Sequence, residues 1–98
     1  MPTYITLLNW TDQGIRAYKN TTERTDAFVA ALQKLGARLV DIHWTVGPYD
    51  LVATVEAPDD ETATAALLQL GGMGNVRTTT LRAFSREEIE SVIAKTSS

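Results

Sequence analysis

The spacing of hydrophobic positions changes along the chain, and it predicts the order of strands and helices. Residues 4–10, 39–46 and 51–56 alternate, with some breaks, between apolar and polar side chains, which is typical of strands that bury one face. Residues 76–84 are the fourth expected strand. The connection 47–50 contains Gly and Pro, so the second and third strands are expected to form a hairpin.

Between the first and second strands the spacing is that of a helix. Apolar side chains repeat at intervals of three and four residues between Phe28 and Leu35, and Gly36 stands where a left-handed C-cap is common. Asn20 and Glu23 resemble a capping box, so this helix is expected to begin directly after Asn20.

Two more helices are expected further along the chain. One starts at Asp59 or Asp60, which can cap it, and ends at the glycine pair 71–72. The other covers residues 85–95 and starts at a capping-box pattern formed by Ser85 and Glu88. The apolar side chains of this last helix are Ile89, Val92 and Ile93.

The order strand, helix, strand, strand, helix, strand predicts an α+β fold of the ferredoxin-like β-α-β-β-α-β type. Both crossover helices then cover one face of a four-stranded antiparallel sheet, and the expected strand order is 4-1-3-2. We expect a single domain over residues 1–98, with its core in residues 3–84 and the last helix as a C-terminal addition.

Alternation along the strands predicts which residues face the helices. The side chains assigned to the helix side are Ile5, Leu7, Val40, Ile42, Trp44, Leu51, Ala53, Val55, Leu81 and Ala83. The face without helices is expected to carry Tyr4, Thr6, Leu8, Trp10, Asp41, His43, Thr45, Val52, Thr54, Glu56, Thr78, Thr80 and Arg82. The apolar residues among them would form an exposed patch, and exposed apolar patches of several hundred Å² are uncommon on monomers. A typical interface takes roughly 800 Å² per partner, about what one face of a four-stranded sheet can supply. We therefore expect a homodimer or higher oligomer in which two such faces meet.

Composition narrows the classes of function. The chain has no cysteine, which excludes disulfides, thiolate nucleophiles and cysteine-ligated metal sites. Its net charge is −3 and its nine Lys and Arg residues are scattered, so no nucleic-acid partner is expected. No apolar run is long enough to cross a bilayer and no secretory pattern is visible, so we expect no membrane partner and a cytoplasmic location.

Four stretches of the chain resemble the GYD-domain family. They are residues 8–15 (LNWTDQGI), 44–50 (WTVGPYD), 56–60 (EAPDD) and 74–84 (GNVRTTTLRAF), in this order. The Gly-Tyr-Asp motif of the family appears as Gly47, Tyr49 and Asp50, with Pro48 in a variable position. The resemblance covers about residues 3–90 and implies a ferredoxin-like, dimeric α/β-barrel type of architecture. It implies no activity.

His43, the only histidine, is the first candidate for chemistry, and Asp41 lies two residues away on the same face. If Val46 pairs with Leu51, Glu56 falls opposite Asp41, and two carboxylates in that position repel each other. A cation, a metal or solvent would have to relieve the repulsion. In a pocket, His43 would act as a general acid–base or a ligand, oriented by Asp41 or Glu56. The competing interpretation, which we favour, is an interface or edge cluster satisfied by hydrogen bonds.

Four further residues are candidates for ligand binding. Arg82 could bind an anionic ligand, Trp10 could line a cavity, and Tyr49 and Asp50 of the hairpin turn could contact a ligand. Each has a structural alternative, namely a salt bridge, core packing or turn formation. One histidine and two carboxylates are a minimal ligand set for a transition metal, but no ligand spacing supports such a site. We expect no metal and no cofactor.

Two functions from different classes remain open. The first is a small oligomeric binding or accessory module, with a possible small-molecule ligand in a cleft between sheet and helix or between subunits. The second is a cofactor-independent enzyme, similar to a monooxygenase or isomerase, with His43 as general base. Fold analogy alone supports the enzyme, and one fold hosts many functions. We favour the binding module.

Overall fold

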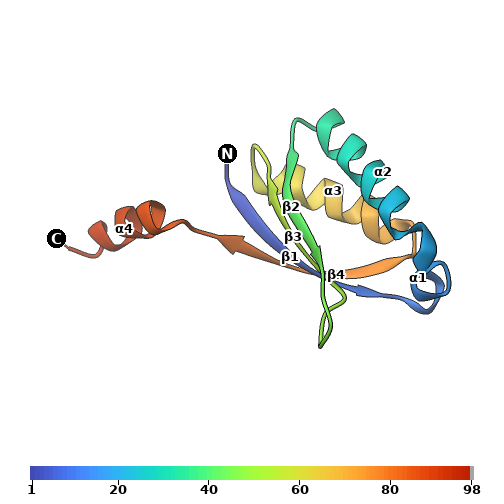
Figure 1. Cartoon of the computed structure of the whole chain (residues 1–98). Coiled ribbons are helices and arrows are strands. Elements are labelled where there is room, and N and C mark those ends of the chain that lie inside the picture. The colour runs from blue at the N-terminus through green and yellow to red at the C-terminus, as the bar shows by residue number, and fades with distance from the viewer. Residues whose placement is uncertain (98) are drawn as a thin grey trace.

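The computed structural model of the chain describes residues 1–97 and has an α+β fold, in which two long helices lie on one face of a four-stranded sheet (Figure 1). Within the described residues, no helix covers the other face, which is the lower side of the sheet in Figure 1. In chain order the elements are β1 (Thr3–Trp10), α1 (Asp12–Arg16), the 3-10 helix η1 (Tyr18–Asn20), α2 (Thr21–Lys34), β2 (Arg38–Trp44), β3 (Leu51–Glu56), α3 (Asp60–Gly72), β4 (Val76–Ala83) and α4 (Arg86–Ala94).

All neighbouring strands are antiparallel, and their order is β2-β3-β1-β4. Read from the opposite edge, this is the expected order 4-1-3-2. The central strands are β1 and β3, while β2 and β4 form the edges. None of the helices within residues 1–97 has the length and apolar content needed to span a bilayer.

The helix ends mostly follow the local sequence. Asp59 caps α3 by accepting a hydrogen bond from the Thr62 backbone N–H at 2.8 Å, and Ser85 and Glu88 form the expected capping box of α4. Gly36, one residue beyond the C-cap Leu35 of α2, has a φ of 75°, the left-handed conformation that glycine adopts after a helix end. The expected capping box at Asn20 is wrong. Asn20 has φ −94° and ψ 8° rather than an extended backbone, because α2 continues directly from η1.

The face of the sheet under α2 and α3, which we call the covered face, holds the core. Leu51, Ala53 and Val55 of β3 are buried there, as predicted. The prediction for β1 is wrong, because the side chains buried on the covered face are Tyr4, Thr6 and Leu8, while Ile5 and Leu7 lie on the other face. The error has a physical source: both faces of β1 carry apolar side chains, and the polar groups of Tyr4 and Thr6 find partners that alternation does not show.

Those partners come from distant parts of the chain. The Tyr4 hydroxyl donates a hydrogen bond to the Asp60 carboxylate at the start of α3. The Thr6 hydroxyl pairs with the Thr80 hydroxyl of β4 at 3.1 Å. A buried polar group costs little once it is hydrogen-bonded, so both residues can occupy the core.

The facing of β4 follows from that of β1, because directly opposite residues share a face. Thr6 lies opposite Thr80 and Tyr4 opposite Arg82, so Thr80 and Arg82 are on the covered face. The prediction for β4 is therefore wrong as well. Arg77, Thr79, Leu81 and Ala83 lie on the face without helices.

In β2 the predicted side of the sheet is confirmed for the residues after the register shift, where the pairing with β3 is regular. Trp44 lies opposite Leu51 and Ile42 opposite Ala53, so both are on the covered face as expected. The register shifts between Leu39 and Asp41, which places Leu39 rather than Val40 opposite Val55. Val40 is left exposed on the edge strand.

Candidate functional site

The uncovered side of the sheet, which we call the open face, has an apolar centre. Ile5 and Leu7 of β1 lie between Val52 of β3 and Leu81 of β4, and Leu81 is 49 % exposed. We call these four residues the open-face patch. Threonines and charged side chains surround it, such as Thr54 and Thr79 beside the patch, Asp41 and His43 on β2, and Arg77 on β4. A surface of this kind resembles the core and rim of a protein interface.

The candidate residues His43 and Asp41 lie on this open face, both exposed. His43 is opposite Val52 and Asp41 is opposite Thr54, so the expected clash of Asp41 with Glu56 does not occur. Glu56 instead lies opposite Arg38, and the two side chains form an ion pair with Nε to Oε1 at 2.5 Å. The structure therefore brings His43 and Asp41 to one face but places Glu56 in a separate ion pair at the end of β3.

The Gly-Tyr-Asp segment builds the tip of the β2–β3 hairpin. The Asp50 carboxylate accepts a hydrogen bond from the Trp10 backbone N–H at 2.9 Å, and the Tyr49 carbonyl accepts one from the Thr45 hydroxyl at 2.6 Å. The Pro48 carbonyl accepts a third from the Asn9 side-chain amide at 2.7 Å. These bonds join the tip to the end of β1.

The conformation of Gly47 completes this loop. Its φ is 139°, which L side chains rarely adopt. The pairing of Trp44 with Leu51, rather than Val46 with Leu51, shifts the register by two residues from the expected one. A shift of two preserves the facing of side chains, and for this reason Trp44 and His43 still lie on the expected sides. Val46 is left fully exposed at the tip.

Trp10 and Arg82, expected on the open face, lie on the covered side. Trp10 is partly buried against the core. Arg82 stacks on two aromatic rings, with its guanidinium carbon 5.7 Å from the Tyr4 ring centre and 4.5 Å from that of Phe84. Arg82 therefore has aromatic partners at the end of β4, on the opposite side of the sheet from His43.

The buried phenol of Tyr4 has a pKa well above its ordinary value. Burial, the hydrogen bond to Asp60 and the negative charge of Asp60 raise the pKa of Tyr4 to about 12, while the Arg82 cation acts in the opposite direction. The pair joins the start of α3 to β1.

A groove of about 610 Å³ lies on the covered side between α2, α3 and the sheet. The sequence indicated a cleft between sheet and helix as one possible ligand site, but none of the α2 or α3 residues that line this groove was among the predicted site residues. Its floor includes Thr6, Leu8 and Ala53, and small side chains such as Ala31 leave the space open. The ionisable residues among its described lining are Arg24 and Lys34, both cationic. The alanines of α2 were the available signal, because small side chains on a helix facing a sheet leave room.

Arg24 also joins α2 to the segment before it. Its guanidinium donates to the carbonyls of Gly14 and Ala17, each at 3.2 Å. Gly14 itself packs so closely on Asn75 that a Cβ there would lie 1.9 Å from the Asn75 carbonyl oxygen. The Thr11 hydroxyl donates to the Gly74 carbonyl at 2.5 Å. The first and last stretches of the family resemblance thus meet in a structural junction.

Within residues 1–97, no three His, Asp or Glu side chains lie close enough together to hold a metal ion. His43 and the groove lie on opposite sides of the sheet, since Ile42, the neighbour of His43, is the β2 residue that lines the groove. The structure therefore presents two separate surfaces that could bind a partner: the open face with its hairpin, and the groove.

These features define a small α+β protein whose uncovered sheet face has an apolar centre, next to a hairpin held by the Gly-Tyr-Asp segment. The chain belongs to the GYD-domain family, because the model of the GYD domain matches residues 4–93. This confirms the resemblance read from the sequence.

Two similar proteins come from Thermus thermophilus. One, named glutamine synthetase and cystathionine beta-lyase binding protein, is 39 % identical over 84 residues, which are 85 % of this chain and 88 % of the relative. The other is known from a crystal structure, with 29 % identity and a TM-score of 0.56 over 87 % of this chain and 95 % of the other. The first of these relatives is named as a protein that binds other proteins.

Proposed function

We propose that the protein is a small binding or accessory module that self-associates through its open face, as a ferredoxin-like dimer of the α/β-barrel type. The observation that carries this proposal is the open-face patch, four apolar side chains at the centre of a sheet face that no described helix covers. Full burial of an exposed apolar side chain contributes about 1.5–3 kcal/mol, and side chains that are already half-buried gain a part of this, so self-association would be favoured by burying this face. The proposal includes the cytoplasmic location expected from the sequence.

A matched pair of variants tests the proposed interface. Leu7→Arg places a charge in the open-face patch, whereas Leu68→Arg makes the same change on α3, where Leu68 is 72 % exposed. We expect light scattering to show a loss of oligomer for Leu7→Arg and none for Leu68→Arg, since an unpaired charge in an interface is costly. Equal effects of the two changes would contradict the assignment.

The name of the 39 % identical relative supports a partner of a particular kind. We propose that this chain likewise binds glutamine synthetase, cystathionine β-lyase or both. Size-exclusion chromatography of the purified chain mixed with each enzyme should show co-elution, with an unrelated oligomeric enzyme as the control. If neither enzyme shifts the elution of the chain, this part of the proposal is wrong, while the self-association test stands separately.

The groove supports a small-molecule ligand as a second binding function. A volume of about 610 Å³ lies in the usual range for ligand pockets, and a largely apolar lining with Arg24 and Lys34 fits an apolar molecule that carries a negative charge. The probe would be the anionic dye anilinonaphthalene sulfonate. Ala31→Trp should fill the groove and lower dye binding, whereas Thr64→Trp, on the exposed side of α3, should not.

The enzyme alternative, with His43 as general base, has weaker support. His43 is exposed on the open face, and the groove that could enclose a substrate lies on the other side of the sheet. We expect His43→Ala to leave dye binding in the groove and enzyme co-elution unchanged. A loss of ligand turnover specific to His43→Ala, in a chain of unchanged stability, would instead favour the enzyme.

A further inference from the structure

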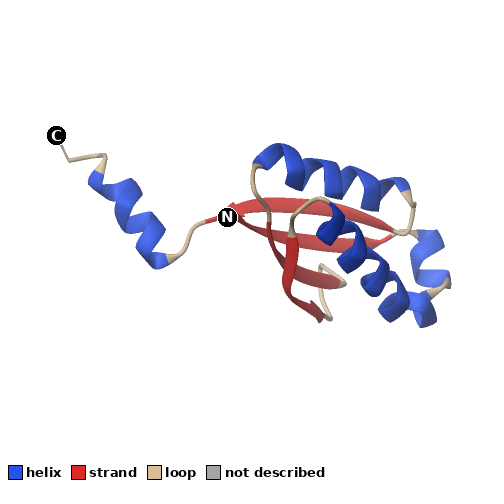
Figure 2. Ribbon diagram, turned by 90° about the horizontal axis from the view of Figure 1, so that it is seen from above, coloured by secondary structure: helices blue, strands red, loops and turns tan. Residues whose placement is uncertain are grey.

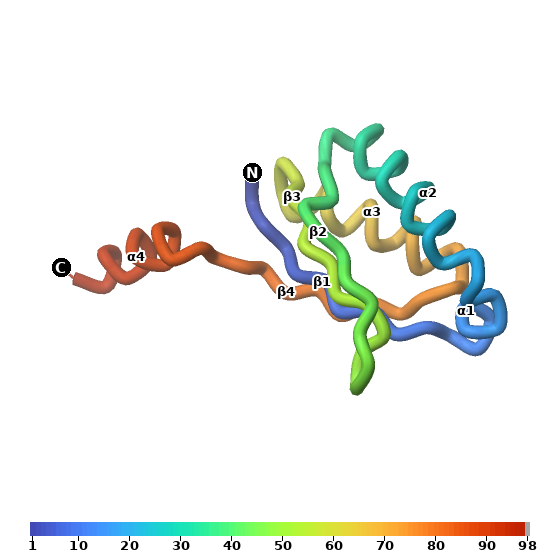
Figure 3. Tube along the Cα trace, in the orientation of Figure 1, coloured from blue at the N-terminus to red at the C-terminus, as the bar shows by residue number. Residues whose placement is uncertain are grey.

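Helix α4 stands clear of the rest of the molecule (Figures 1, 2 and 3). Its apolar side chains form one stripe along the helix, at positions three and four residues apart. All three are exposed, Ile89 at 40 %, Val92 at 42 % and Ile93 at 56 %. The remaining side chains of the helix are mostly charged, so α4 is an amphipathic helix whose apolar side has no cover within residues 1–97.

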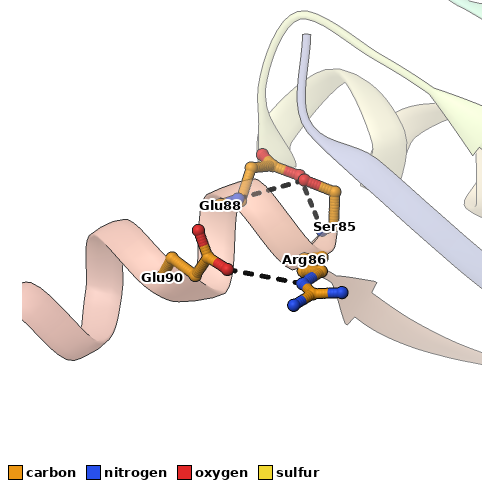
Figure 4. Close-up of polar contacts among 4 residues, drawn as sticks. All are labelled: Ser85, Arg86, Glu88 and Glu90. Carbon is orange, nitrogen blue, oxygen red and sulfur yellow. Dashed lines mark hydrogen bonds and ion pairs between the residues drawn. The ribbon is translucent and has the colours of Figure 1, made fainter.

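A helix of this length gains most of its stability by packing its apolar stripe against another surface. Its nine residues span about 14 Å, and helices shorter than roughly 12–15 residues are marginal on their own in water. The capping box of Ser85 and Glu88 and the ion pair of Arg86 with Glu90 at 3.4 Å specify where the helix starts (Figure 4). The exposed ion pair contributes little stability and the capping box stabilises only the first turn, so burial of the stripe would supply the main stabilisation of the helix.

The exit of the chain from the sheet directs α4 away from its own body. Two residues, Phe84 and Ser85, connect β4 to α4, and Ser85 is extended with φ −70° and ψ 170°. The Phe84 ring lies against the Arg82 guanidinium, which itself lies over Tyr4 in the core. The helix therefore projects from the end of the sheet at which Ala83 pairs with Thr3.

A second exposed apolar feature lies at the other end of the sheet. The β2–β3 hairpin extends from the end of β1 where Leu8 pairs with Leu51, and its tip protrudes on the side away from α2 and α3 (Figure 1). Val46 at this tip is fully exposed. The hydrogen bonds of Asp50, Tyr49 and Pro48 hold the tip in place, so Val46 is presented on a fixed loop.

We propose that α4 is an exchanged arm. In this arrangement the stripe of Ile89, Val92 and Ile93 packs on the β2–β3 hairpin of a second copy, against Val46, and the arm of the second copy packs on the hairpin of the first. The two features extend beyond opposite ends of β1, a strand about 25 Å long. A two-fold axis through the open face brings each arm to the other copy's hairpin, so one symmetry operation covers both exposed features.

The size of the open face supports a contribution from the arms. Four strands of six to eight residues, about 4.8 Å apart and about 20–26 Å long, outline a sheet face of roughly 450 Å² in projection, and the open-face patch forms its apolar centre. A standard interface buries roughly 800 Å² of accessible surface on each partner, more than four half-buried apolar side chains supply. Two arms and two hairpin tips extend the contact beyond the sheet on both copies. The arm exchange rests on the proposed self-association and specifies what completes it.

The absence of cysteine from the sequence makes a cross-linking test direct. Purified Val46→Cys and Ile93→Cys chains, carrying different tags, are mixed and oxidised, so that a disulfide joining the two tags can only link different molecules. We expect a covalent heterodimer of doubled mass on a non-reducing gel. Ser91→Cys, on the polar side of the same helix, is the matched control and should not cross-link to Val46→Cys.

A second pair of variants measures the contribution of the stripe. Ile93→Asp should raise the dissociation constant of the dimer by about tenfold or more, because it places a charge in an apolar contact, whereas Ser91→Asp should leave it unchanged. If the full chain forms dimers but Ile93→Cys and Ser91→Cys behave alike, the arm exchange is wrong and the open-face interface stands. If the full chain is a monomer, both proposals are wrong.

Discussion

Leu7 and Leu8 are neighbours in β1 but have different surroundings. Leu8 is buried at 5 % exposure on the covered face beside Leu51, whereas Leu7 lies on the open face between Val52 and Thr79. The covered face satisfies its polar groups within the chain, as the pairs of Tyr4 with Asp60 and Thr6 with Thr80 show. No described helix covers the open face. The contrast indicates that one face of the sheet stabilises the fold and the other is available for a partner.

The largest expected effect comes from removing covered-face packing. Leu8→Ala should lower the free energy of unfolding by about 2–5 kcal/mol, because it leaves a cavity in the core. Chemical denaturation measures this loss, and it should be equal at low and high protein concentration. A small loss would show that the two faces are less different than their burial indicates.

The neighbouring change, Leu7→Ala, should lower stability in a concentration-dependent way. We expect a loss of about 1–2 kcal/mol when the chain is assembled, and a smaller one on dilution, because Leu7 is proposed to be buried by a second copy. Denaturation of both chains at several concentrations gives the measurement. A loss that is independent of concentration would place the role of Leu7 within the monomer.

The raised pKa of Tyr4 makes the stability of the fold depend on pH. The folded chain holds the phenol protonated up to a pKa of about 12, whereas the unfolded phenol loses its proton near its ordinary pKa of 10. The contribution of Tyr4 to stability is therefore complete below pH 10 and is lost as the pH rises from 10 through about 12.

Tyr4→Phe should remove this part of the alkaline loss, at a cost of about 0.5–1.5 kcal/mol at neutral pH for the missing hydrogen bond to Asp60. Denaturation between about pH 8 and pH 12 compares the two chains across the pKa values of the unfolded and folded phenol. Tyr18→Phe is the control, since Tyr18 is 53 % exposed, and it should keep the alkaline loss of the parent chain.

The smallest effect is expected at the ion pair of Arg38 with Glu56, whose side chains are 62 % and 27 % exposed. Arg38→Gln should cost at most about 1 kcal/mol, and salt should reduce the difference. Arg86→Gln, at the more exposed pair with Glu90, should cost less. Thermal unfolding at low and high salt distinguishes these cases, and a larger, salt-independent loss would show that Arg38 has another role.

The sequence predicted the order of elements, the strand order and the helix ends at Asp59, Ser85 and Gly36, because these depend on local spacing and capping. It failed on which side of the sheet β1 faces. That choice depends on hydroxyl partners such as Thr80 for Thr6, which lies 74 residues away, and no local pattern reports such a pair. The assignment of β4 failed separately: alternation placed Leu81 and Ala83 on the helix side, but they lie opposite Ile5 and Thr3 and therefore on the open face.

Only some of the candidate site residues lie on the side of the sheet that the sequence predicted, because the prediction failed for β1 and β4. His43 and Asp41 lie on the open face as expected, since a two-residue shift in the hairpin preserves facing. Trp10 and Arg82 do not, because they follow the facing of β1 and β4. Tyr49 and Asp50 take part in the hydrogen bonds that hold the hairpin tip to β1, and a ligand contact at either residue stays a prediction. The exposure of Val46 and of the α4 stripe could not be predicted, because exposure depends on what each element packs against.

Light scattering on the intact chain over a dilution series tests most directly whether the open face is an interface. We predict a mass of at least twice 10.7 kDa at micromolar concentration, falling toward 10.7 kDa on dilution. Leu7→Arg should give the monomer mass over the whole series. A mass of 10.7 kDa for the unaltered chain at every concentration, up to the highest soluble one, would contradict the assignment of the open face.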